Sequence, residues 1–216
     1  MKLNKESLKK SLLLYAITDS NMIGNSTLSE KVEEAILGGA TMIQLREKNI
    51  SKKKYLALAK EVKEITDKYN IPLIIDDDVE VALACDAAGV HVGQKDMDAS
   101  VARDKIGPEK ILGVSTQTIE QAILAEKAGA DYLGVGAVFP TSTKDDAALV
   151  TMETLKAICN AVNIPVVAIG GIKEDNIINL KGSGISGISV VSAIFAHEDV
   201  REAARKLRVQ IDKILK

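Results

Sequence analysis

The stretch IPLIIDDDVEVALACDAAGVHVGQKD, residues 71–96, decides the fold because a strand, a helix and a second strand follow one another in it without a break. The apolar run at 72–75 has the length of a buried strand and ends abruptly in acidic residues. Residues 79–88 are typical of a helix, and the short apolar run at 90–92 is typical of another strand. The pattern predicts two parallel strands joined by a helix.

The acidic residues of this stretch stand just past the ends of the two strands. Asp76, Asp77 and Asp78 follow the first strand, and Asp96 follows the second. Neighbouring strands lie about 4.8 Å apart, so Asp77 and Asp96 can converge on one point. Two carboxylates with open coordination positions suit Mg²⁺, which keeps waters and is completed by substrate phosphates. Acids after strands also cap helices, which is the role we expect for Asp78, whereas Asp77 and Asp96 together favour a metal site.

The same strand–helix unit recurs along the chain. We expect strands at residues 13–18, 42–46, 73–76, 89–93, 111–115, 132–136, 166–170 and 188–192. We expect helices to begin near residues 28, 51, 79, 99, 118, 152, 173 and 198. Eight such pairs without a linker predict an α/β protein with one (β/α)₈ TIM-barrel domain over residues 1–216, including a short helical extension at 1–11.

A doubly wound sheet is the alternative architecture. Its glycine fingerprint would follow the first strand, but the sequence there has no glycines. A G-x-G-x-x-G pattern does begin at Gly182, yet it precedes a strand, so we interpret it as a tight turn that leads into the eighth strand. The barrel remains the better prediction.

Composition excludes several classes of protein. A net charge of −2 and a pI near 5.8 provide no basic field for nucleic acid, and 3% aromatic residues with no Trp provide no stacking platform. No segment approaches the roughly 18 apolar residues of a membrane span, and the apolar run at 12–14 is too short for a secretory signal. We therefore expect a cytoplasmic protein that binds neither nucleic acid nor membrane.

Polar and charged side chains end the second strand, in Gln44-Leu45-Arg46-Glu47-Lys48. Active sites of such barrels lie at the C-terminal ends of the strands, and alternation places Gln44, Arg46 and Lys48 on one face. These groups are costly to bury inside a barrel without an anionic or hydrogen-bonding ligand, and Arg is a natural bidentate phosphate clamp. Neutralisation by Glu47 and neighbouring acids is the alternative interpretation.

Other strand ends carry small or hydroxyl-bearing residues. Ser115 ends the fifth strand, and a loop with three hydroxyls and a lysine, Thr141 to Lys144, follows the sixth. That loop is suited to fold over a ligand phosphate, although a solvated polar lid would have the same composition. The loops after strands seven and eight, which contain Gly171 and Ser192, commonly bind phosphate in this fold.

Two histidines and two cysteines add little chemistry. We expect His91 to be a hydrogen-bonded residue of the barrel interior and His197 to be solvated, while Cys85 and Cys159 form no C-x-x-C pair and are expected as small buried side chains. The sequence thus provides two anion-binding regions without an obvious nucleophile or base. This combination favours the joining of two phosphorylated small molecules, with diphosphate as the metal-bound leaving group.

Motifs at nearly every strand end resemble the thiamine-phosphate synthase family. In chain order they are Gln44-Leu45-Arg46-Glu47-Lys48, the acid pair after strand three, residues 89–97 (GVHVGQKDM), 113–115 (GVS), 139–144 (FPTSTK), 168–172 (AIGGI) and 190–194 (VVSAI). The resemblance covers nearly the whole chain. It implies a transferase that joins 4-amino-2-methyl-5-(diphosphooxymethyl)pyrimidine to 4-methyl-5-(2-phosphooxyethyl)thiazole, giving thiamine phosphate and diphosphate. The family mechanism is dissociative.

The resemblance also implies residue roles. Mg²⁺, one ion per site, would be held by Asp77 and Asp96, and the catalytic residues would be Arg46, Lys48, Ser115 and Lys144. The residues that would bind the pyrimidine diphosphate are Gln44, Leu45, Arg46, Glu47, Lys48, Asp76, Ser115 and Lys144. The residues that would bind the thiazole phosphate are Thr141, Ser142, Thr143, Gly171, Val191 and Ser192. A homodimer is suggested by the resemblance alone.

One residue departs from the family pattern. Asp76 stands where the family usually carries Asn, immediately before the first metal-binding Asp. An ionised Asp only accepts hydrogen bonds, whereas Asn also donates. We hypothesise weaker binding of the pyrimidine diphosphate or an altered demand for Mg²⁺.

Two other functions compete with this one. A thiazole tautomerase-like relative would not need the diphosphate and metal residues, so Arg46, Lys48, Asp77, Asp96 and Lys144 argue against it. A non-catalytic barrel that binds thiamine precursors is the second alternative, in which Asp76 would mark lost activity.

Overall fold

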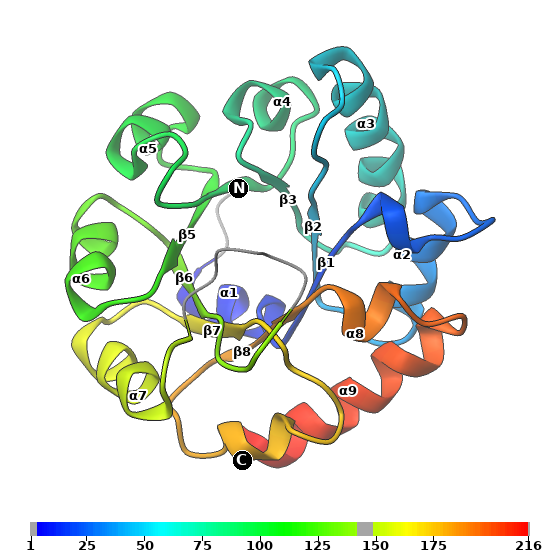
Figure 1. The fold of residues 1–216 in the computed structure, drawn as a ribbon. Coiled ribbons are helices and arrows are strands. Elements are labelled where there is room, and N and C mark those ends of the chain that lie inside the picture. The colour runs from blue at the N-terminus through cyan, green and yellow to red at the C-terminus, as the bar shows by residue number, and fades with distance from the viewer. Residues whose placement is uncertain (1–3, 142–148, 216) are drawn as a thin grey trace.

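The computed structural model describes residues 4–141 and 149–215, which form a closed barrel of eight parallel strands in sequence order, with β1 paired to both β2 and β8 (Figure 1). The strands are β1 (Leu14–Ile17), β2 (Met42–Leu45), β3 (Leu73–Asp76), β4 (Gly89–Val92), β5 (Ile111–Thr116), β6 (Tyr132–Gly136), β7 (Val166–Ile169) and β8 (Gly187–Val190). The predicted (β/α)₈ fold is confirmed.

Most helices surround the strands, whereas α1 (Lys5–Ser11) lies within the ring of strands in the view of Figure 1. The other helices are α2 (Leu28–Leu37), α3 (Lys52–Lys68), α4 (Val79–Ala84), α5 (Ala99–Ile106), α6 (Ile119–Lys127), α7 (Met152–Ala161), α8 (Ser192–Phe195) and α9 (Val200–Ile214), with 3₁₀ turns η1 (Ser20–Met22) and η2 (Ile177–Leu180). The side chain of Asp78 accepts from the backbone N–H of Val81 at 2.9 Å, so the predicted cap of α4 is present. Among the described residues, no helix is both long and apolar enough to span a bilayer.

Two cores result from the alternation along each strand. Side chains that point outward pack against the helices, whereas those that point inward fill the barrel, among them Tyr15, Met42, Ile74, Tyr132 and Val167. Leu8 of α1 and the following Leu12 join this interior cluster. The helical extension thus closes one end of the barrel and leaves the opposite end, with the C-terminal strand ends, for a site.

The structure differs from prediction after β7. A helix was expected near residue 173, but the segment forms only the short turn η2. The side chain of Asn176 accepts from the N–H of Lys173 at 2.8 Å and donates to the carbonyl of Gly171 at 2.9 Å. These side-chain bonds compete with helical backbone bonds and hold the loop beside the barrel mouth. Strand eight also ends earlier than expected, so that Ser192 opens α8.

Candidate active site

A cavity of about 370 Å³ opens at the C-terminal ends of the strands. Its wall contains predicted site residues from both halves of the barrel, namely Arg46, Lys48, Asp76, Asp77, Asp96, Ser115, Thr141, Gly171, Val191 and Ser192. Strands that are distant in sequence bring them together because the closed barrel directs every strand end to the same rim.

Three of the remaining predicted residues, Leu45, Glu47 and Gln44, do not line this cavity. Leu45 points outward into the core between strands and helices, where its carbonyl accepts from the Tyr55 hydroxyl at 2.8 Å. Glu47 accepts a 2.5 Å hydrogen bond from the hydroxyl of Ser20. Gln44 is 2% exposed and lies within the barrel interior. Ser142, Thr143 and Lys144 are outside the described residues.

Basic side chains form one side of the cavity. The guanidinium of Arg46 approaches the Asp76 carboxylate at 3.6 Å between Nε and Oδ2, and both side chains are largely buried. A contact of this length is a loose ion pair, which leaves the planar guanidinium suited to a bidentate anion. Lys48 is exposed at the same wall. The arrangement can bind a phosphate or diphosphate group.

Three carboxylates crowd the adjacent wall. The backbone of Asp77 has φ +60°, a left-handed conformation, and its N–H donates to the carbonyl of His91 at 2.8 Å. Asp96 accepts from the N–H of Gly93 at 2.7 Å. Burial, and then the neighbouring Asp76 and Asp96, raise the pKa of Asp77. Burial also raises the pKa of Asp76, although Arg46 opposes this shift.

Asp77 and Asp96 could together hold a cation. Carboxylates that resist ionisation beside one another would be stabilised by a divalent ion, and oxygen donors are those that Mg²⁺ prefers. Within the described chain, no three His, Cys, Asp or Glu side chains form a complete metal-binding group. Asp77 and Asp96 therefore fit an open site that water and substrate oxygens complete, not a closed protein cage.

A buried hydrogen-bonded chain runs beneath the cavity. Gln44 Nε2 donates to the Tyr15 hydroxyl at 2.7 Å, and the hydroxyls of Tyr15 and Tyr132 are 2.8 Å apart. His91 Nδ1 lies 2.9 Å from the Tyr132 hydroxyl, and His91 Nε2 lies 2.9 Å from Ser115 Oγ. Burial raises the pKa of both tyrosines, so the phenols are neutral. His91 is thus the hydrogen-bonded interior residue that the sequence predicts.

Several cavity residues were not predicted as site residues: Gln94, Lys95, Thr116, Gln117 and Ser189. Ser189 is 2% exposed, and its hydroxyl has no hydrogen-bond partner among the described residues. Alternation from Gly187 to Val191 would have placed Ser189 on the inward face of β8. That signal was available in the sequence, but one serine in an apolar strand does not distinguish a ligand contact from packing.

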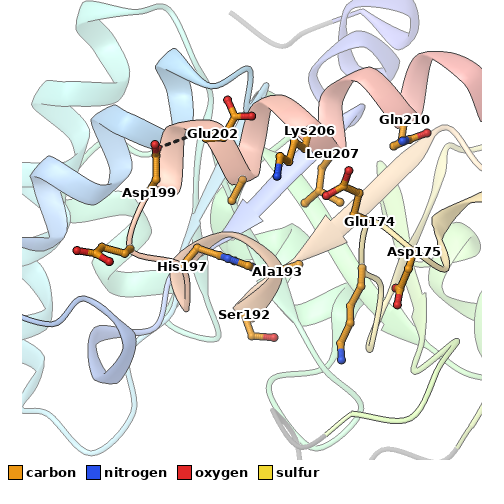
Figure 2. Close-up of a pocket in the computed structure, with 13 residues that line it drawn as sticks. Glu174, Asp175, Ser192, Ala193, His197, Asp199, Glu202, Lys206, Leu207 and Gln210 are labelled. Atoms are coloured by element: carbon orange, nitrogen blue, oxygen red, sulfur yellow. Dashed lines mark hydrogen bonds between the residues drawn. The ribbon is translucent and has the colours of Figure 1, made fainter.

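A second, wider cavity of about 850 Å³ lies beside α9 and the loop after β7, and it meets the first at Ser192 and Ala193. Figure 2 shows Glu174, Asp175, Asp199 and Glu202 around it. With Glu198, five carboxylates line it against Lys173 and Lys206, and this excess of negative charge disfavours a phosphorylated ligand. The cavity at the barrel mouth, with its arginine and lysines, is therefore the candidate active site.

Comparison with known proteins agrees with this assignment. A family model described as thiamine monophosphate synthase matches residues 14–194. A thiamine-phosphate synthase of Clostridium tetani is 56% identical over 90% of this chain and 93% of its own length. The corresponding protein of Clostridium beijerinckii is 53% identical over 93% of this chain and 96% of its own length.

A solved structure supports the same relationship. Thiamine phosphate pyrophosphorylase from Pyrococcus furiosus superimposes with a TM-score of 0.89 at 44% identity, covering 97% of this chain and all of the other. Because the family model, the sequence relatives and this structure agree over nearly the full chain, the protein belongs to the thiamine monophosphate synthase family.

Proposed function

We propose that this protein is a thiamine-phosphate synthase, a transferase that joins the pyrimidine diphosphate and the thiazole phosphate named above to give thiamine phosphate and diphosphate. Family membership supports the reaction. The observation that carries it is that one cavity contains both predicted halves of the site. Arg46 and Lys48 lie beside the Asp77 and Asp96 carboxylates on its wall, which also includes Gly171 and Ser192.

The diphosphate half of the site uses the first group of residues. Arg46 would clamp the diphosphate through its planar guanidinium, and Lys48 would add a point charge at the mouth. Asp77 and Asp96 would hold one Mg²⁺, which when bound neutralises charge that develops on the leaving diphosphate. Lys144 is predicted to contact the same group from the loop after β6.

The thiazole phosphate half uses the loops after β6, β7 and β8. Gly171 has φ +67°, and a Cβ there would overlap the carbonyls of Phe139 and Pro140. Glycine thus lets the loop after β6, with Thr141, pack directly against the loop after β7. Thr141, Val191 and Ser192 lie at the cavity wall, where a hydroxyl and backbone N–H groups can meet a phosphate.

Catalysis in this proposal needs no protein base. The C–O bond to diphosphate breaks with its electron pair leaving on oxygen, the pyrimidine stabilises the resulting cation, and the thiazole nitrogen forms the new C–N bond. The cavity supplies positioning and electrostatic stabilisation, the two contributions that its residues can make. A tautomerase-like function would leave Arg46 and the carboxylate pair without a purpose.

The decisive experiment mixes both phosphorylated substrates with Mg²⁺ and measures thiamine phosphate. Product formation that depends on Arg46, with Lys127→Ala on the outer face of α6 as a control of equal charge loss, would support the proposal. No product at any Mg²⁺ concentration would overturn it. If the inactive protein still bound thiazole phosphate, the non-catalytic binding barrel would replace it.

A cytoplasmic location and a homodimer complete the proposal. The location is supported only by the relatives, which are named as synthases of thiamine phosphate. Light scattering after size-exclusion chromatography tests the dimer, and a mass near the chain's 23.1 kDa would contradict it.

A further inference from the structure

The hydrogen-bonded chain from Gln44 to Ser115 crosses the barrel from β2 to β5 and connects two predicted contacts of the pyrimidine substrate. Its central members, Tyr15 and Tyr132, are 1% and 0% exposed and do not line the cavity. They therefore cannot touch a ligand directly. Any influence of the two tyrosines on the reaction must pass through their neighbours in the hydrogen-bonded series, of which His91 and Ser115 line the cavity.

The bonds of this chain have one direction. Gln44 Nε2 can only donate, so the Tyr15 oxygen accepts from it. A buried hydroxyl proton needs an acceptor, and the other oxygen bonded to Tyr15 is that of Tyr132. The Tyr132 hydroxyl in turn donates its hydrogen bond to His91 Nδ1. The direction at Gln44 thus determines the direction at each later bond.

This direction selects one tautomer of His91. If Nδ1 accepts from Tyr132, a neutral imidazole carries its proton on Nε2, which then donates to Ser115 Oγ. The Ser115 oxygen is thereby used as an acceptor, which leaves its own proton to be donated to a ligand in the cavity that Ser115 lines. Ser115 is presented as a donor, which is the role that an anionic ligand requires.

Two glycines make the meeting of Tyr132 and His91 possible. A Cβ at Gly113 would overlap the Tyr132 ring and hydroxyl and lie 2.5 Å from His91 Nδ1. A Cβ at Gly134 would lie 3.3 Å from His91 Cε1. Gly113 and Gly134 both face the barrel interior on neighbouring strands, and neither has a positive φ that would require glycine. The space itself is what these positions provide.

We propose that Tyr132, supported by Tyr15, is a positioning residue that acts through His91 to hold Ser115 as a hydrogen-bond donor toward the substrate diphosphate. The ligand contact in this inference rests on the proposed function. The direction of the hydrogen bonds from Gln44 to Ser115 does not rest on that function, because it is a property of the ligand-free protein.

The first experiment measures the tautomer of His91 by ¹⁵N NMR of the ligand-free protein. The protein contains only two histidines, and the exposed His197 serves as an internal reference. We expect His91 to carry its proton on Nε2 in the native protein and to become a mixture of tautomers in Tyr132→Phe. A proton on Nδ1 in the native protein, or an unchanged tautomer in Tyr132→Phe, would overturn the proposal.

Two further variants keep this measurement interpretable. Tyr69→Phe removes a hydroxyl that bonds to Glu33 outside the barrel, and it should leave the His91 signals unchanged. Tyr15→Phe breaks the chain next to Gln44 while retaining Tyr132 and His91, so it should weaken the tautomer preference less than Tyr132→Phe does. If Tyr132→Phe does not fold, the native spectrum and Tyr15→Phe still decide the question. A His91 tautomer preference that is unchanged in Tyr15→Phe would contradict the proposal.

The second experiment is kinetic. A hydrogen bond to a charged group contributes enough that its loss should raise the KM for the pyrimidine diphosphate about 10-fold in Tyr132→Phe, with the KM for the thiazole phosphate unchanged. Ser115→Ala should have a similar effect, and the double variant should lose no more than Ser115→Ala alone. Additive losses would overturn the proposal. The proposed function fails separately, if the tautomer is as expected but no thiamine phosphate forms.

Discussion

Arg46 Nε lies 3.6 Å from Asp76 Oδ2, so the cation best placed to bind a diphosphate already has an anionic neighbour inside the protein. Most family members are expected to carry Asn at this position. The Asp76 carboxylate is 14% exposed and therefore only weakly screened by solvent. This pairing makes the charge at position 76 a determinant of substrate affinity.

Asp76→Asn should lower the KM for the pyrimidine diphosphate by several-fold, roughly the effect of a partly buried ion pair of about 1 kcal/mol. The substitution removes a negative charge beside the diphosphate and releases Arg46. Steady-state kinetics at saturating thiazole phosphate measure the change. Asp78→Asn is the matched control, because Asn also caps α4 well and that carboxylate caps a helix outside the cavity. An unaltered KM in Asp76→Asn would contradict this expectation.

Asp77→Asn should raise the Mg²⁺ concentration needed for half-maximal activity by at least about 10-fold, because one of two anionic oxygen ligands becomes a neutral amide. Asn tolerates the left-handed φ of +60° at this position, so the backbone should be retained. Mg²⁺ titration by calorimetry provides the measurement without turnover. Asp98→Asn, at the cap of α5, changes the same charge at a helix start and should leave Mg²⁺ binding unchanged.

Mg²⁺ binding should strengthen as the pH rises from about 6 to about 8, the values to which the pKa of Asp76 and of Asp77 are raised. Protonated carboxyls must lose their protons before they can bind the ion, so binding should release protons into the buffer. Calorimetry in buffers of different ionisation enthalpy counts them. Proton release that stays at zero across this range would show that the carboxylates are already ionised.

The free energy of unfolding of the metal-free protein should fall as the pH rises, whereas Mg²⁺ binding strengthens. A carboxyl whose pKa is higher in the folded state binds more protons when folded, so this contribution to stability is lost as the pH rises through the raised pKa. We expect the Tm to rise more on Mg²⁺ addition at pH 8 than at pH 6. The Asp77→Asn variant should lose most of that difference.

Gly171→Ala should destabilise the protein by more than the roughly 1 kcal/mol that a left-handed φ costs a non-glycine residue, because its Cβ would also overlap the carbonyls of Phe139 and Pro140. Gly182→Ala is the matched control, since Gly182 has a similar φ of +72° but no atom within 4 Å of the added Cβ. Comparing the urea unfolding midpoints of the two variants separates the cost of backbone strain from the cost of steric overlap. A KM increase for thiazole phosphate should accompany Gly171→Ala only, and equal unfolding midpoints would contradict the packing argument.

Elements of the barrel were predictable where their signals are local. The run at 72–75 and the acids that follow it needed only chain order to place Asp77 beyond a strand end, and the structure has β3 at Leu73–Asp76. The expected helix near residue 173 was wrong because the Asn176 side chain bonds to the backbone at Lys173 and Gly171 and so competes with helical hydrogen bonds. The helix-forming residues nearby give no sign of this competition.

Placement of the site residues was predictable to the same extent. Arg46 and Asp96 needed only their strand ends, since every C-terminal strand end of a closed barrel faces one rim. Leu45 was included through the resemblance, and the alternation of the strand directs its side chain into the outer core instead. The approach of Arg46 to Asp76 depends on the register of β2 and β3, which pairs Leu45 with Ile75.

The sequence by itself determined the eight-stranded barrel, its active rim and the residue types on that rim, because periodicity and strand ends are properties of neighbouring residues. Only the tertiary structure decided which interior side chains meet. Tyr15 and Tyr132 are separated by 117 positions, and their hydroxyls are brought to 2.8 Å by barrel closure and by the space at Gly113. Such a contact has no local signature, since each tyrosine alone is only one more apolar residue in a buried strand.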